Sequence, residues 1–139
     1  MTRNSTDRSD GSSASSRSAG IGIDLVELER FRKAFRRKGF REKVFTSREI
    51  EECEAKKDSL SSYAARFAVK EAFFKALADP TSKAVPWKQI ETEGMGDTPT
   101  LRLSDALQAR TPGMQVLVSL THSGRMAAAV VLILPPLMH

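Results

Sequence analysis

One carboxylate in the sequence lies on an apolar background. Glu71 belongs to the segment 66–77, RFAVKEAFFKAL, whose phenylalanine spacing predicts an amphipathic helix. At about 100° per residue, Glu71 shares one side of this helix with Phe67 and Phe74, and Lys75 follows one turn later. Glu71 and Lys75 could form an ordinary surface ion pair, which stabilises a helix only slightly. Alternatively, a desolvated carboxylate and an ammonium group could form half of a site for a cation and a phosphate.

Asp24 is a second carboxylate in an apolar setting. It lies in the segment 20–25, GIGIDL, where alternate apolar residues on one face predict a short strand. Gly22 is expected to leave room beside Asp24 for a bulky ligand to approach the backbone. Asp24 could cap the helix expected after the strand, or it could bind a ligand.

Helical patterns follow the first strand. Residues 26–38 carry apolar side chains at spacings of three and four, which predicts a helix that Gly39 ends. Thr46 followed by Glu49 is the pattern of a capping box, so a second helix is expected over 46–58.

A polar break over 59–62 is expected to precede the Glu71 helix, which Asp79 and Pro80 should end. The second half of the chain then changes to strand patterns. The runs expected to be strands are 87–93, 101–103, 114–120 and 126–134.

Two further features belong to this second half. Ser104 is expected to begin a short helix. His122 lies in the joint 121–125 of the last predicted hairpin, where a histidine is commonly an ordinary surface residue.

Together the patterns predict an α+β fold, with helices from the N-terminal half packed on a mostly antiparallel sheet.

Length and composition are those of one domain. The Ser-rich residues 1–19 are expected to be a disordered tail, and residues 20–139 a single domain. No apolar run reaches the roughly 18 residues of a membrane span. The single cysteine, Cys53, excludes an internal disulfide and suits a reducing compartment, and no signal peptide is evident. These features predict a cytoplasmic protein.

Positive charge is concentrated in one segment. Residues 29–43 contain eight Lys and Arg residues against two Glu, a net charge of +6, whereas the whole chain carries +5. This density exceeds what solubility requires and favours an acidic partner. Nucleic acid is one candidate, but the aromatic residues here have core-facing spacing and are not free to stack on bases. An acidic protein helix or a polyphosphate ligand fits as well.

Five segments of the chain resemble a known family. They resemble the holo-acyl-carrier-protein synthase branch of the 4'-phosphopantetheinyl transferases over nearly all of residues 20–134. The segments are GIGIDLVELERF, FTSREIEEC, RFAVKEAFFKAL, WKQIETE and VSLTHSGRMAAAVVL. Gly-x-Asp followed about 45 residues later by Lys-Glu-Ala-x-x-Lys is more specific than either motif alone. The resemblance implies that the protein transfers the phosphopantetheine arm of coenzyme A to a serine of an apo acyl carrier protein. Magnesium would be required and adenosine 3',5'-bisphosphate would leave.

The resemblance also implies residue roles. Asp24 and Glu71 would hold Mg²⁺ through carboxylate oxygens, and Glu71 and Lys75 would be catalytic. The serine proton could pass to Glu71 or to a magnesium-bound water, and both remain open. The side chains expected to contact coenzyme A are Lys70, Lys75, Thr121 and His122.

The basic segment would bind the acidic carrier protein. Arg30 matches a family arginine on the docking face, and neighbouring residues are expected to help by charge: Arg32, Lys33, Arg36 and Arg37. Small enzymes of this branch are typically trimers, so a homotrimer with active sites between subunits is expected. A single short chain could not easily enclose coenzyme A.

The chain departs from the family pattern in two places. A Gly-Thr-Gly loop usually follows the KEA helix, whereas Ala78-Asp79-Pro80-Thr81 stands here and offers fewer amides to a phosphate. Met126 stands where tyrosine is common.

Two alternatives to an active transferase follow from the sequence. One is a catalytically weak relative that still docks carrier proteins, which is tested by coenzyme A binding with magnesium. The other is a basic nucleic-acid-binding module, which predicts salt-dependent binding without a need for Glu71.

Overall fold

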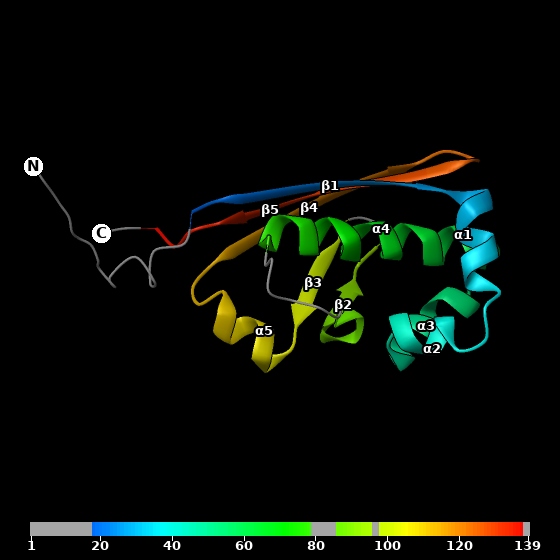
Figure 1. Ribbon diagram of the computed structural model, residues 1–139, viewed down its shortest axis with the longest axis horizontal. Helices are drawn as coiled ribbons and strands as arrows, with labels where there is room; N and C mark the ends of the chain where they lie inside the picture. Colours follow the sequence, from blue (N-terminus) through cyan, green and yellow to red (C-terminus); the bar gives the residue numbers. More distant parts are fainter. Residues whose placement is uncertain (1–17, 79–85, 96–97, 138–139) are drawn as a thin grey trace, which may run out of the picture.

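The computed structural model describes residues 18–78, 86–95 and 98–137 (Figure 1). The expected disordered tail therefore lies almost wholly outside the described residues, as do Asp79, Pro80 and Thr81 of the altered loop. The elements, in chain order, are β1 (Gly20–Glu27), α1 (Leu28–Phe35), α2 (Phe40–Val44), α3 (Ser47–Glu54), α4 (Ser59–Leu77), η2 (Trp87–Gln89), β2 (Ile90–Glu93), β3 (Thr100–Leu103), α5 (Asp105–Arg110), β4 (Gln115–His122) and β5 (Met126–Leu134).

The elements form two antiparallel sheets around one long helix. The larger sheet has the order β1-β5-β4, and β2 pairs with β3 in a second sheet. Figure 1 shows α4 lying along one face of the larger sheet, with β2, β3 and α5 on the other side of the helix. The short helices α1, α2 and α3 gather at one end. The expected α+β class is confirmed.

Helix α4 is the centre of the core, and its predicted amphipathic character is wrong. Its buried residues surround most of the helix, from Tyr63 and Ala64 to Phe73 and Leu77. This occurs because the sheet covers one side of α4 while α3 and β2 cover others. The predicted apolar stripe is the more accessible part, where Glu71 is half-buried and Lys75 is exposed.

Strand β1 approaches α4 unusually closely. A Cβ added to Gly22 would lie 1.9 Å from the carbonyl oxygen of Ala72, and one added to Gly20 would lie 2.1 Å from that of Ala76. Helix backbone therefore fills the space beside Gly22, and the expectation that this space admits a ligand is wrong. The close contact fixes the height of Asp24 above the helix.

The outer face of the larger sheet is apolar and uncovered within the described chain. Alternation in β1 turns Asp24 toward α4, so the opposite side chains point outward. The exposed apolar side chains on this face include Ile21, Ile23 and Leu25 of β1 and Leu117 of β4. Ile23, the central one in β1, is 68% exposed.

Several local predictions are confirmed. Thr46 and Glu49 form a complete capping box at the start of α3, and Ser104 caps α5. The last two strands form the expected hairpin, although β4 continues to His122.

Other boundaries differ from the prediction. The helix expected over 26–38 is shorter, and Gly39, in the left-handed region at φ 82°, leads into the unpredicted helix α2. The polar residues 59–62 continue as the first turn of α4, because Asp58 accepts a hydrogen bond from the amide of Ser61 and caps the helix there. The region 87–93, expected to be one strand, begins with the 3₁₀ helix η2 and becomes a strand only in β2.

Candidate functional site

Asp24 lies in the middle of β1 and faces α4. It is only 9% exposed, and its Oδ1 accepts a hydrogen bond of 3.0 Å from the Lys75 ammonium. The other oxygen, Oδ2, is buried without a hydrogen-bond partner in the described chain. The N-cap residue of α1 is Glu27, so the alternative in which Asp24 caps that helix is wrong.

Glu71 comes from α4 and is electrostatically coupled to Asp24. Partial burial raises the pKa of the Glu71 carboxyl, and the negative charge of Asp24 raises this pKa further. The positive charge of Lys75 acts in the opposite direction. Asp24 and Glu71 thus lie close enough for their charges to interact, and a cation bound near both would stabilise both charged forms.

Lys75 joins the two elements that carry the carboxylates. Its ammonium donates to Asp24 Oδ1 and to the carbonyl oxygen of Ile23, each at 3.0 Å. The simple surface pair of Glu71 and Lys75 is therefore not the arrangement found, since the ammonium hydrogen-bonds across to β1. The Lys75 side chain is 55% exposed and can reach a bound anion.

The donor set fits magnesium. Mg²⁺ typically takes one or two protein carboxylates and completes its octahedron with phosphate and water oxygens. Asp24 and Glu71 supply two carboxylates, and the buried Oδ2 of Asp24 lacks a partner within the described residues. Those residues contain no group of three or more His, Cys, Asp or Glu side chains that could hold a metal. A site completed by substrate phosphates matches this donor set.

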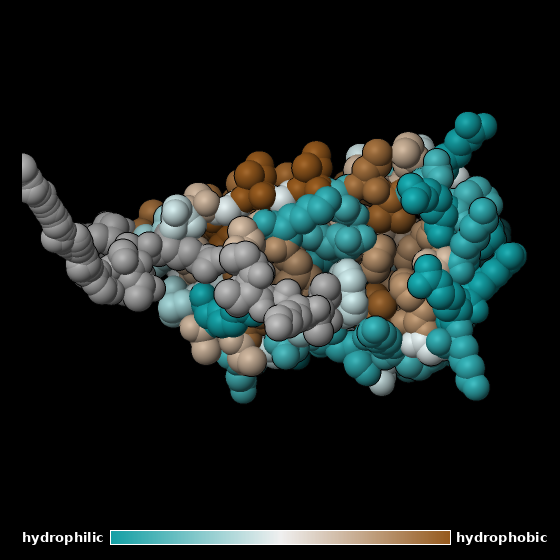
Figure 2. Space-filling view, viewed as in Figure 1, coloured by the Kyte–Doolittle hydropathy of each residue, from teal (hydrophilic) through white to brown (hydrophobic). Residues whose placement is uncertain are grey.

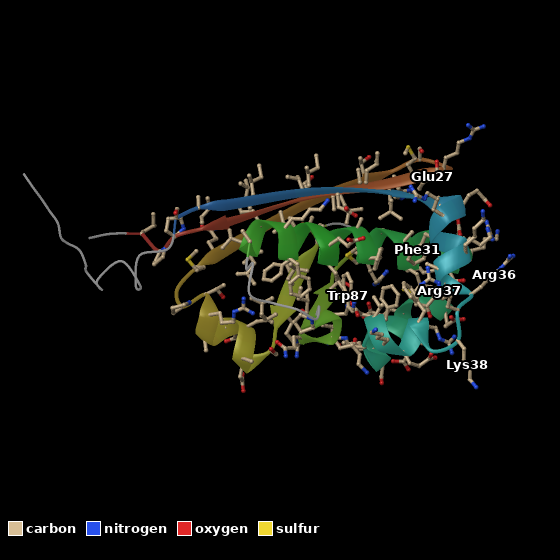
Figure 3. The ribbon with its side chains drawn as sticks, viewed as in Figure 1. Glu27, Phe31, Arg36, Arg37, Lys38 and Trp87 are labelled. Carbon is tan, nitrogen blue, oxygen red and sulfur yellow. The ribbon has the colours of Figure 1, made fainter. Side chains whose placement is uncertain are left out.

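A hollow of about 380 Å³ opens beside Glu71. Its lining includes Glu27, Arg30 and Phe31, so the predicted docking arginine borders the same space as the carboxylate. Lys33, Arg36 and Arg37 are exposed on and after α1. Figure 3 shows Arg36, Arg37 and Lys38 at the end of the molecule that also carries Glu27 and Phe31. The basic surface and the carboxylate site are therefore adjacent.

A second hollow, of about 750 Å³, lies beside the end of β4. Both Thr121 and His122 line it and are exposed. Glu71 and His122 thus border different hollows in the described part of one copy.

Arg66 lines the second hollow and was not singled out from the sequence. It is 3% exposed, donates to Ser62 Oγ at 2.6 Å and Glu52 Oε1 at 3.0 Å, and its Nε has no described partner. Lys56 and Lys57 line the same hollow. An arginine inside the otherwise apolar run 64–69 is the signal that could have identified this position.

Lys70 is not placed to bind coenzyme A, which corrects the prediction. Its side chain is fully buried, and the ammonium donates to Glu49 Oε1, Val44 O and Trp87 O at 2.6, 2.8 and 3.1 Å. An ammonium has three donors, so these contacts use all of them. Lys70 and Glu71 are consecutive, and about 100° of helix rotation sends them to different sides of α4.

The fold agrees with a comparison to known families. A family model described as the 4'-phosphopantetheinyl transferase superfamily matches residues 20–130, and the chain belongs to this superfamily. Among its curated relatives is a holo-[acyl-carrier-protein] synthase of Chlamydia trachomatis serovar L2. The two are 39% identical over 113 residues, covering 80% of this chain and 95% of the relative.

Solved structures of the same branch have the same fold. An ACPS-CoA complex from Chronobacterium ammoniagenes matches with a TM-score of 0.75 and 25% identity, over 87% of this chain and all of the other. A Bacillus anthracis holo-(acyl-carrier-protein) synthase, in complex with CoA (3',5'-ADP), matches with a TM-score of 0.68 and 32% identity. This match covers 84% of this chain and 96% of the other.

Proposed function

We propose that this protein is a holo-[acyl-carrier-protein] synthase. It transfers 4'-phosphopantetheine from coenzyme A to a serine of an apo acyl carrier protein and releases adenosine 3',5'-bisphosphate. The observation that carries this proposal is the convergence of Asp24, Glu71 and Lys75 from β1 and α4 in a chain of this family. The coenzyme A complexes of similar structures support the choice of donor.

The reaction requires charge stabilisation at a transferring phosphoryl group. The serine oxygen forms a bond to the β-phosphorus of coenzyme A, the bond from that phosphorus to the leaving adenosine 3',5'-bisphosphate breaks, and the serine proton passes to Glu71 or to a water. Asp24 and Glu71 would hold Mg²⁺, which would supply positive charge to neutralise the pyrophosphate oxygens. Lys75 adds an ammonium that can contact the same phosphate.

The basic surface gives the carrier protein a docking site. Arg30 borders the hollow beside Glu71, and Lys33, Arg36 and Arg37 extend the positive charge from there. An acidic helix bound to this surface would bring its serine next to the carboxylates. Such complementary charge chiefly speeds association and fixes orientation.

A homotrimer with active sites between subunits would unite the two hollows. In one copy, Glu71 and His122 line separate hollows, so His122, Thr121 and Arg66 of a neighbouring copy could contact coenzyme A bound near Glu71. Figure 2 shows hydrophobic side chains along the top of the molecule, over the larger sheet. An exposed apolar face of this kind suits an interface between copies.

The protein is expected to act in the cytoplasm. Cys53 is a buried free thiol, which suits a reducing compartment. No helix in the described part of the chain is long and apolar enough to span a membrane.

The direct test is intact-mass analysis of an apo acyl carrier protein. After incubation with this protein, coenzyme A and Mg²⁺, we expect a mass increase of about 340 Da on the carrier, the size of one phosphopantetheinyl group. A folded protein that modifies none of several acidic carrier proteins would contradict the proposed activity.

A further inference from the structure

Glu49 and Lys70 form a fully buried ion pair outside the proposed active site. The Lys70 ammonium lies 2.6 Å from Glu49 Oε1, and both side chains are 0% exposed. Glu49 Oε2 accepts hydrogen bonds from the amide and hydroxyl of Thr92, at 2.8 and 2.7 Å. Glu49 Oε1 also accepts from the amide of Thr46 at 3.0 Å. Every donor of the lysine and both oxygens of the glutamate therefore have partners.

The pair ties α4 to several elements at once. Val44 ends α2, Thr46 and Glu49 begin α3, Trp87 lies in η2, and Thr92 lies in β2. The Lys70 ammonium connects α4 to α2, α3 and η2, and Glu49 extends the connection to β2 through Thr92. Buried ion pairs are seldom the most stabilising choice, because well-packed apolar residues often do as well or better. Stability alone therefore does not account for this arrangement.

The side of α4 that faces β1 packs through small residues and backbone atoms. There the glycines of β1 meet the backbone at Ala72 and Ala76, which sets the distance between strand and helix. The side chain of α4 that hydrogen-bonds to β1 is Lys75, which is 55% exposed and therefore holds the helix less firmly than a buried group. Lys70 lies on another side and is anchored in a defined position, so it can fix both the rotation and the axial register of α4.

Rotation of α4 directly affects the metal carboxylates. A carboxylate about 6 Å from the helix axis moves about 2 Å when the helix turns by about 20°, which is comparable to a magnesium–oxygen bond. Asp24 belongs to β1 and would not follow that movement. The separation of Asp24 and Glu71 therefore depends on the angle at which α4 is held.

We propose that the buried Lys70–Glu49 pair positions Glu71 opposite Asp24 for magnesium binding. The pair touches neither substrate nor metal, so both are positioning residues. This inference rests on the proposed function, since it assumes that Asp24 and Glu71 hold Mg²⁺. It also gives Lys70, within the Lys-Glu-Ala motif, a role that is distinct from that of its neighbour.

The test replaces the pair with neutral side chains of similar size. In the double variant Glu49→Gln/Lys70→Met, an amide oxygen remains for Thr92 and an apolar chain fills the lysine channel. We expect a folded protein whose Mg²⁺ affinity, measured by calorimetry at saturating coenzyme A, is at least about tenfold weaker than native. Affinity for the carrier protein without Mg²⁺ should be unchanged, because the basic surface is untouched.

Two further variants separate positioning from general stability. Leu107→Ala removes a fully buried side chain of α5 and should lower the melting temperature while keeping native Mg²⁺ affinity. Glu49→Asp keeps both charges and shortens the anchor by one methylene, so it should weaken Mg²⁺ binding several-fold. Glu49→Asp therefore tests the positioning role even if the double variant does not fold.

The outcomes are distinct. Folded pair variants with Mg²⁺ affinity within twofold of native would overturn the positioning role, as would equal weakening in Leu107→Ala. Native protein that binds Mg²⁺ and coenzyme A but transfers nothing would instead contradict the proposed function. The Mg²⁺ affinities of the native and variant proteins would still decide the positioning role.

Discussion

Without a bound cation, the folded protein disfavours the charged form of the Glu71 carboxyl. Its burial and the nearby carboxylate of Asp24 both favour the protonated form, and Lys75 compensates only in part. A raised pKa in the folded state means that protonation stabilises the fold. This contribution is present at low pH and is lost as the pH rises through the raised pKa.

Removing that charge should stabilise the metal-free protein. For Glu71→Gln at pH 7 without Mg²⁺, we expect the melting temperature to rise by about 1–3 °C, a modest effect because the group is only half-buried. The advantage should shrink as the pH falls toward the ordinary pKa of glutamate. The exposed Glu51 of α3 provides the control Glu51→Gln, which should change little. A lower melting temperature for Glu71→Gln would contradict this electrostatic account.

Gly22 should tolerate no side chain. In Gly22→Ala the new Cβ would lie 1.9 Å from Ala72 O, so β1 and α4 must separate. We expect a loss of at least about 2 kcal/mol in the free energy of unfolding, measured by urea denaturation. Gly124 has no atom within 4 Å of an added Cβ, so Gly124→Ala is the matched control. Equal stability of the two variants would show that the strand and helix are not in tight contact.

Residue roles were only partly predictable from the sequence. Asp24 and Glu71 were paired through their motifs, and the structure brings their elements together. Lys70 was misassigned because its burial depends on Glu49, which lies 21 residues away. Arg66 was missed because its position at the edge of the second hollow depends on how β4 lies beside α4.

Helix α4 is the element that organises the site, and its C-terminal end is strained. Ala78 is the only non-glycine residue with positive φ in the described chain, at φ 49° and ψ 52°. Glycine adopts this left-handed conformation without the steric cost that Cβ imposes.

Relieving that strain should stabilise the protein. Ala78→Gly should increase the free energy of unfolding by about 1 kcal/mol, measured by urea denaturation. Ala55 is the control, because it caps α3 in the right-handed region at φ −78°. Ala55→Gly should give no gain and a small loss from chain entropy. A gain in both variants, or in neither, would contradict the strain at Ala78.

The elements themselves were predicted better than their environments. Capping boxes and alternation are local signals, so α3, α5 and the last hairpin were found with small shifts. The amphipathic interpretation of α4 was wrong because a helix enclosed by a sheet, β2 and other helices has no single apolar side. Only the assembled tertiary structure contains that information.

At the scale of the molecule, the α+β arrangement leaves one apolar sheet face uncovered in the described chain. Leu25, Ile23 and Ile21 point outward from β1, and β4 adds Leu117. The proposed trimer accounts for this face and for the separation of the two hollows.

A charge placed in this face should break the assembly. We expect native protein to sediment at about three times the 15.3 kDa chain mass, and Ile23→Glu to sediment as a single chain. The folded single-chain variant should also lose transfer, since Glu71 and His122 would no longer share a pocket. Thr100→Glu, at an exposed position of β3, should leave the assembly intact. A native protein that sediments as one chain yet is fully active would contradict the shared site.

The most direct test of the account is transfer to an apo acyl carrier protein as a function of Mg²⁺ concentration. It compares native protein with Asp24→Ala, Glu71→Ala and Gly124→Ala, and follows carrier mass. We predict Mg²⁺-dependent transfer in native protein and Gly124→Ala, and a loss of at least about 100-fold in both carboxylate variants. Native-like transfer by either carboxylate variant, at low Mg²⁺ and with the fold intact, would contradict the assignment of this site.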